Sequence, residues 1–113
     1  MNKSNKFLGR WRITHMDEWD QDYIDLVVHG FIQFDPDNLG EFQFGTVHGF
    51  LDTRIEQDGS VQRIEFSWAG KNDTDPGSGR GWALVEGGLL IGHLYIHLSD
   101  DSEFTAERTR GSI

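Results

Sequence analysis

The chain has 113 residues, a length that allows a single domain, spanning 1–113, with a modest hydrophobic core. Its formal net charge is −9 and its ten Lys and Arg residues are scattered, which argues against nucleic acid or an anionic membrane as a partner. The lack of cysteine excludes disulfides and thiolate catalysis. Residues 1–6 lack the apolar run of a signal peptide, so we expect a cytoplasmic protein. A secreted protein that has lost its signal is the weaker alternative.

The composition favours an all-β fold made of short strands. Fourteen Gly and two Pro suit tight turns, and eight Phe, four Trp and two Tyr supply a large apolar area. Alternating polarity between turn signals predicts eight strands, which cover 7–16, 30–35, 41–47, 50–57, 60–69, 81–86, 89–98 and 103–109. Tight hairpins are expected at Asp58-Gly59 and Gly87-Gly88. The prediction is an eight-stranded antiparallel up-and-down (meander) barrel.

Two further segments bear on the strand count and spacing. We take His48-Gly49 as a tight turn; if it is instead a bulge within one long strand, the barrel has seven strands. The segment Lys71–Arg80 is rich in Gly, Asp and Ser and is predicted to be a polar loop.

The segment Asp17–Val28 is predicted to form a short helical lid after the first strand. Trp19, Tyr23, Leu26 and Val27 have the spacing of an apolar helix face that packs on one end of the barrel. The acidic residues of the segment lie mostly off that face. They lack the alternating carboxylates, Gly and late Glu of a calcium loop, so no metal site is predicted here.

The hairpin turns fix which side chains share a face, because directly paired residues point to the same side of a sheet. The Gly87-Gly88 turn places Trp82 opposite His93. Pairing Ser99 with Ser102 then places His93 opposite Arg108. The charged side chains of the last strand belong in water, so we expect the other face to line the lumen. The expected lumen residues are Trp11, Ile13, His15, Phe42, Phe44, Leu51, Thr53, Ile55, Ile64, Phe66, Trp68, Trp82, Leu84, Ile91, His93, Tyr95, His97, Phe104, Ala106 and Arg108.

This register leaves an apolar stripe on the outer wall, formed by Val85, Leu90, Leu94, Ile96 and Leu98. Monomers rarely expose such a stripe, so we expect a second copy to cover it in a homodimer. The alternative is a bulge near Gly92 that shifts the register and turns these residues inward.

With this architecture, the chain resembles the calycin superfamily of lipocalin-like barrels. The residues that carry the resemblance are Gly9-Arg10-Trp11 on the first strand and Arg108 on the last. It implies a closed barrel in which Gly9, Trp11 and Arg108 form a structural plug, with the arginine lying across the indole ring. The chain lacks the second lipocalin sequence motif, Thr-Asp-Tyr, and has no segment for a helix after Arg108.

The function favoured by the sequence is the binding of a small apolar or aromatic molecule with a polar end inside the barrel. The predicted ligand-binding residues are Phe44, Thr53, Phe66, Trp68, Trp82, His93, Tyr95 and His97. One alternative is a filled barrel that acts as a non-enzymatic interaction or inhibitor module, since eight strands enclose little space. A further alternative is a heme barrel with one axial histidine. No catalytic residue, cofactor or metal site is predicted, and His93 and His97 lie about 13 Å apart along a strand, too far to share an ion.

Overall fold

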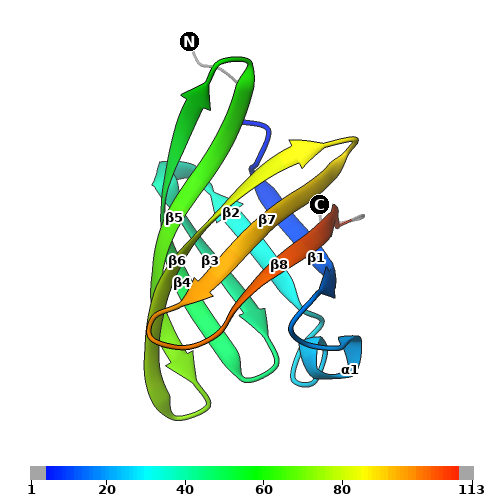
Figure 1. Ribbon diagram of the computed structural model, residues 1–113, viewed down its shortest axis with the longest axis vertical. Helices are drawn as coiled ribbons and strands as arrows, with labels where there is room; N and C mark the ends of the chain where they lie inside the picture. The colour runs from blue at the N-terminus through cyan, green and yellow to red at the C-terminus, as the bar shows by residue number, and fades with distance from the viewer. Residues whose placement is uncertain (1–4, 110–113) are drawn as a thin grey trace.

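The computed structural model describes residues 5–109 and forms a closed barrel in which each strand pairs with its neighbours in sequence order. The strands are β1 (Gly9–Met16), β2 (Phe31–Asp35), β3 (Leu39–Phe44), β4 (Val47–Asp58), β5 (Val61–Asn72), β6 (Asp75–Glu86), β7 (Leu89–Ile96) and β8 (Asp101–Arg108). Helix α1 (Gln21–Ile24) follows β1, and the 3-10 turn η1 (Pro36–Asn38) joins β2 to β3. The predicted all-β meander barrel of eight strands, with a short helix after the first strand, is confirmed (Figure 1). Within residues 5–109 no helix is long and apolar enough to cross a membrane.

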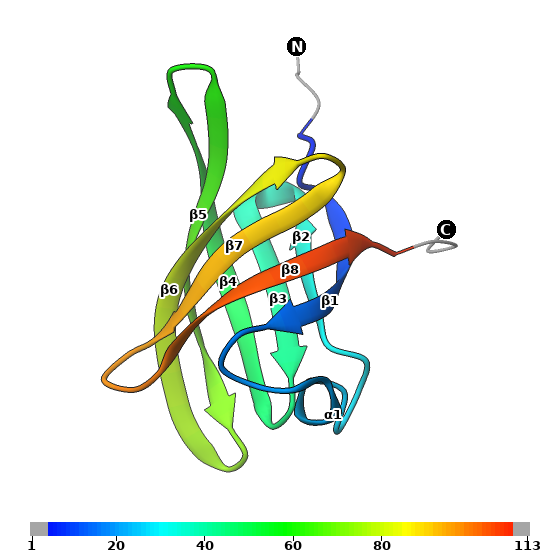
Figure 2. The same cartoon turned by 45° about the vertical axis from the view of Figure 1, so that its right-hand side comes forward.

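The barrel closes where β1 pairs with β8, so segments from both ends of the chain lie side by side (Figure 2). Trp11 is the direct partner of Arg108. A bulge between Ile13 and His15 interrupts the register of β1. It leaves His15 exposed and brings Met16 into the core, so the prediction that His15 lines the lumen is wrong.

The turn between β3 and β4 lies at Gly45-Thr46, not at His48-Gly49 as predicted. Gly45 has a φ of 56°, the left-handed conformation that such a turn requires. Gly49 lies inside β4 and serves packing instead. A Cβ added to it would lie 2.6 Å from ring atoms of both Phe42 and Trp68.

The predicted polar loop Lys71–Arg80 is in fact the end of β5, a turn at Asp73-Thr74 and the first half of β6. This hairpin projects beyond the barrel at the end that carries α1, and the β4–β5 hairpin projects at the opposite end (Figures 1 and 2). Gly79 of this segment faces inward, and an added Cβ would lie 2.7 Å from Nε1 of Trp68. The glycines that suggested a loop therefore belong to a strand, where the missing side chains leave space for aromatic rings.

The register of β7 is predicted correctly on one side and wrongly on the other. Trp82 pairs with His93 as expected from the Gly87-Gly88 turn. Across from β8, however, His93 faces Glu103 and not Arg108. The connection between β7 and β8 is four residues, 97–100, where the sequence suggested a two-residue turn. The β8 residue that pairs with His93 therefore differs from the predicted one by an odd number of positions. An odd shift exchanges the inner and outer faces of β6 and β7.

The apolar stripe predicted for the outer wall is therefore wrong. Leu90 and Leu94 are 0% and 3% exposed and belong to the core, and Val85 and Ile96 pack against it. Leu98 lies beyond the end of β7 with 93% of its surface exposed. These strands pair without a register shift at Gly92, so the longer connection, and no bulge, turns the leucines inward. The prediction of a homodimer was based on this stripe and loses that support.

Candidate functional site

The lumen is packed with large side chains. The buried core consists of Phe7, Trp11, Ile13, Met16, Ile24, Ile32, Phe34, Phe42, Phe44, Val47, Leu51, Ile64, Phe66, Trp68, Ala83, Leu90, Leu94, Phe104 and Ala106. Edge-to-face contacts connect the rings; those of Phe42 and Trp68 lie 5.0 Å apart at an angle of 84°. The cavity beside Phe42 and Leu94 has a volume of about 10 Å³. That is no more than the roughly 10–15 Å³ needed to hold one water molecule.

The lid segment Asp17–Val28, which contains α1, closes one end of the barrel. Ile24 is fully buried, and the ring of Trp19 lies 4.9 Å from that of Phe44. The Tyr23 hydroxyl is 3.0 Å from Oγ1 of Thr46, which ties the segment to the β3–β4 turn. The predicted helix is shorter than its apolar spacing suggested. It ends at Ile24.

Gly9, Trp11 and Arg108 come together at the other end. The guanidinium carbon of Arg108 lies 4.0 Å from the centroid of the Trp11 ring, a cation–π contact. The same guanidinium donates hydrogen bonds to the carbonyl oxygens of Lys6, at 2.9 Å, and of Leu8. Gly9 has a φ of 109°, and a Cβ there would lie 3.2 Å from Nη1 of Arg108. The cluster holds the chain across this end of the barrel.

Two aspartates anchor the lid segment. Oδ1 of Asp17 accepts hydrogen bonds of 2.7 Å from the Ser102 hydroxyl and from the backbone N–H of Glu103, and the Ser102 bond does most to lower the pKa of Asp17 below its usual 3.8. Asp25 accepts a 2.8 Å bond from the Gly30 N–H and pairs with Arg12 at 2.9 Å. Burial opposes ionisation of Asp25, but the hydrogen bonds and nearby positive charge outweigh it and hold its pKa below 3.8.

We expect Asp25→Asn to lower the free energy of unfolding at pH 7 by about 1–2 kcal/mol, because an amide nitrogen would face the donors that now bind Oδ2. A carboxyl with a lowered folded-state pKa stabilises the fold above 3.8, and this stabilisation is lost as pH falls through its folded-state pKa. The difference between variant and wild type should therefore shrink below pH 3.8. Urea unfolding at pH 7 and pH 3 measures it. Asp22→Asn is the matched control, since Asp22 is exposed on the same helix. Equal effects of the two variants would contradict the anchoring role.

The eight predicted ligand-binding residues divide between the two sides of the wall. Phe44, Thr53, Phe66 and Trp68 face the filled lumen. Trp82, His93 and Tyr95 do not, because of the exchanged faces of β6 and β7, and His97 lies beyond the end of β7 and is exposed. The prediction that these four line the lumen is wrong, and His93 cannot serve there as an axial heme ligand.

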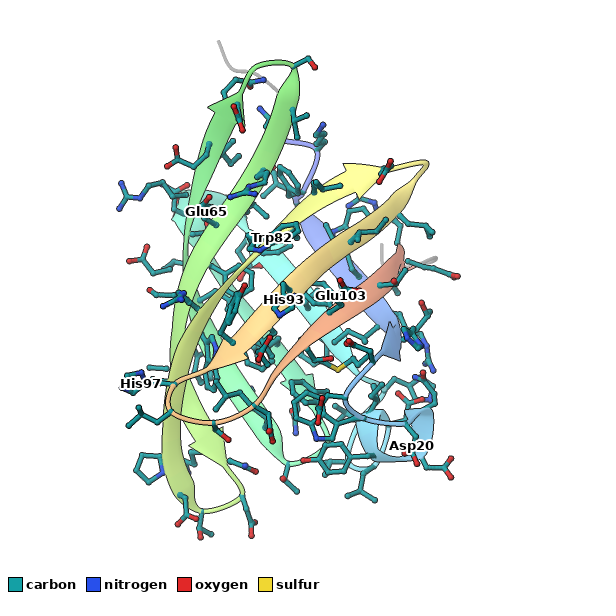
Figure 3. All side chains as sticks on the ribbon, viewed as in Figure 1. Asp20, Glu65, Trp82, His93, His97 and Glu103 are labelled. Carbon is teal, nitrogen blue, oxygen red and sulfur yellow. The ribbon has the colours of Figure 1, made fainter. Side chains whose placement is uncertain are left out.

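Trp82, His93 and Tyr95 nevertheless form one surface, on the outer wall. Direct pairing aligns Glu65, Trp82, His93 and Glu103 in a row across β5 to β8 (Figure 3). A parallel row contains Ser67, Arg80, Tyr95 and Asp101. The rings of His93 and Tyr95 lie 4.6 Å apart, and Nε2 of His93 is 2.5 Å from Oδ2 of Asp101.

Arg80 belongs to this surface, and the sequence interpretation missed it by assigning it to a loop. Its guanidinium carbon lies 5.0 Å from the centroid of the Tyr95 ring. It borders a surface hollow of about 550 Å³ between β5, β6 and the end of β7. The signal that was available is its place two residues before Trp82, which puts both side chains on one face of a strand.

A second surface is apolar and lies on the outer wall of β3 to β5, where the α1 segment leaves the barrel. Val27 and Phe50 are 57% and 58% exposed and border a hollow of about 440 Å³, together with His48. Leu26, next to Val27, is 62% exposed. The apolar spacing placed Leu26 and Val27 against the barrel, but they lie beyond the end of the helix and face outward.

Among residues 5–109, no three His, Asp or Glu side chains come together in a group that could hold a metal ion. A scan against protein-family models finds no match for the chain, and searches of curated proteins and of solved structures find none either.

Proposed function

We propose that the protein is a non-enzymatic interaction module, a filled barrel that binds another protein through its outer wall. The lumen cavity of about 10 Å³ carries this proposal. Ligand pockets usually have volumes of about 300–1,000 Å³, so a small molecule inside the barrel would require the aromatic core to rearrange. We therefore place the binding of a partner on the outer wall of the barrel.

The apolar surface of Leu26, Val27 and Phe50 is the part of the wall best suited to a protein partner. Val27 and Phe50 border a hollow whose lining also includes Lys71 and Asp73, and Leu26 is exposed next to Val27 in the sequence. Protein interfaces commonly have an apolar centre and a polar rim, and exposed apolar patches on small domains mark such sites. The partner is a second protein or a second copy of this chain.

Site-specific photo-crosslinking tests this function in the cells that make the protein. We expect p-benzoylphenylalanine in place of Phe50 to give one discrete adduct, to self or to one other protein. The same probe in place of Val61, which is 46% exposed at the tip of the β4–β5 hairpin, should give none. Adding Val27→Asp should remove the adduct formed at position 50. The same adducts from both positions, or no adduct from position 50, would refute the proposal.

The calycin relationship is also a proposal. It is supported by the closed meander barrel and by the contact between Trp11 and Arg108. It concerns the barrel and its plug, and it assigns no ligand.

A further inference from the structure

The hollow of about 550 Å³ on the outer wall has an unusual charge for this protein. Its lining includes Ser67, Ser78, Arg80, Tyr95, His97 and Leu98, and contains no Asp or Glu. The whole chain carries 19 acidic residues against ten basic ones. A surface depression with an arginine, a histidine and no carboxylate in its lining is therefore set apart from the average surface, and it offers donors to an anion.

The guanidinium of Arg80 has no oxygen partner. It makes no hydrogen bond or ion pair with any residue in the described part of the chain, and its guanidinium lies over the Tyr95 ring. By contrast, Arg12 pairs with Asp25, and Arg63 pairs with Glu65 at 2.7 Å. The stacking on Tyr95 orients a planar group with five N–H donors at the edge of the hollow, which is the arrangement that binds a carboxylate through two parallel hydrogen bonds.

No carboxylate in the described part of the chain forms an ion pair with this arginine. Asp101, in the same cross-strand row, is engaged by His93 at 2.5 Å. Asp52 and Glu65 border a smaller hollow of about 260 Å³ that Arg80 also borders, and Glu65 is paired with Arg63 at 2.7 Å. The side of Arg80 that faces Ser78 and His97 is free of acidic groups.

Leu98 supplies an apolar side chain at the edge of the hollow. It has a φ of 61°, a left-handed backbone conformation that bulky residues rarely adopt. The backbone at this position presents a 93% exposed side chain at the edge of the hollow. Its side chain is placed to cover the apolar part of a molecule whose charged end binds Arg80.

We propose that this hollow binds a carboxylate carried on an aromatic or branched aliphatic group. The carboxylate is held by Arg80, and the apolar group lies against Leu98. Two sources share this chemistry, a free organic acid and the C-terminal residue of a peptide. The site is separate from the apolar surface of Leu26, Val27 and Phe50, so the two proposals stand or fall independently.

An NMR titration tests the site, because Trp68 borders the hollow and its indole N–H donates a 3.1 Å bond to the carbonyl of Tyr95, which also borders it. We expect 3-phenylpropionate to shift this resonance saturably at an ionic strength of about 0.15 M, where long-range repulsion is screened. The uncharged analogue 3-phenylpropan-1-ol should not. Arg80→Gln should weaken binding about tenfold or more, and Arg63→Gln, an arginine outside the hollow, should leave it unchanged.

A second variant separates binding from folding. Leu98→Gly removes the apolar cover and suits the positive φ, so it should weaken 3-phenylpropionate binding without lowering Tm. N-acetyl-Gly-Gly-Phe as free acid and as amide distinguishes the sources. Binding of the free acid about tenfold tighter than 3-phenylpropionate would identify a peptide C-terminus, and equal binding a free acid. The proposal is wrong if the amide or the alcohol binds as well as the acid, or if Arg80→Gln binds like wild type.

Discussion

Gly79→Ala is expected to destabilise the fold by about 4 kcal/mol or more, enough to unfold a domain of ordinary stability. Gly79 lies on the inner face of β6. A Cβ there would overlap the carbonyl oxygen of Tyr95 on the paired strand and lie 2.7 Å from Nε1 of Trp68. A backbone oxygen cannot move aside without displacing β7, so the cost is high.

Gly77→Ala is the matched control on the same strand. Its added Cβ would lie 3.5 Å from the Trp68 ring, an ordinary contact, and Gly77 has no positive φ. We expect a change within about 1 kcal/mol, since replacing Gly by Ala also restricts the unfolded chain. Urea unfolding followed by circular dichroism measures both variants. Equal stability of the Gly79→Ala and Gly77→Ala variants would contradict the close packing of β6 against β7 and Trp68.

Trp11→Ala is expected to lower the free energy of unfolding by about 3–5 kcal/mol. Trp11 is 1% exposed, its indole N–H donates a 2.9 Å bond to the Phe7 carbonyl, and Arg108 lies over its ring. The substitution opens a cavity and removes the surface on which the arginine rests.

Trp82→Ala provides the comparison, because Trp82 lies on the outer wall. The guanidinium carbon of Arg63 lies 4.9 Å from the centroid of its ring. We expect it to cost about 1 kcal/mol, the range of an exposed cation–π contact with modest burial. Circular dichroism is again the suitable probe, since both changes remove a fluorophore. A cost for Trp82→Ala as large as that for Trp11→Ala would contradict the assignment of the two faces.

Local signals in the sequence predict much of the barrel. The first hairpin turn lies at Gly59-Ser60, one residue after the predicted Asp58-Gly59, and the pairing shifts by two residues, so Thr53 and Phe66 keep their predicted inner face. Gly87-Gly88 pairs Trp82 with His93 as predicted. In both places the alternation of the adjoining strands assigns the inner and outer faces correctly.

The remaining register depends on geometry that no local pattern carries. The β7–β8 connection runs through Leu98 in a left-handed conformation that leucine rarely adopts, so nothing in Ser99–Ser102 marks the true pairing. The glycines of β6 resemble a loop because the space they leave is filled by rings from β5, which are distant in sequence.

These two errors also hid the candidate sites. Reading Lys71–Arg80 as a loop removed Arg80 from the sheet, and the wrong pairing of β8 placed its neighbour Tyr95 in the lumen. The apolar surface was hidden because Leu26 and Val27 continue the helical spacing of Trp19 and Tyr23 after the helix has ended. Periodicity shows that a face is apolar, but contacts decide whether it is covered.

The central claim is that the barrel is filled and acts through its outer wall, and a crystal structure under xenon pressure tests it most directly. Xenon enters apolar cavities such as those that Leu→Ala substitutions open in protein cores. We expect no xenon inside the wild-type barrel, and one xenon site beside Phe42 and Phe104 in Leu94→Ala, because Leu94 borders the cavity of about 10 Å³. Xenon bound inside the wild-type barrel would show that the lumen opens to a ligand, and would contradict the account.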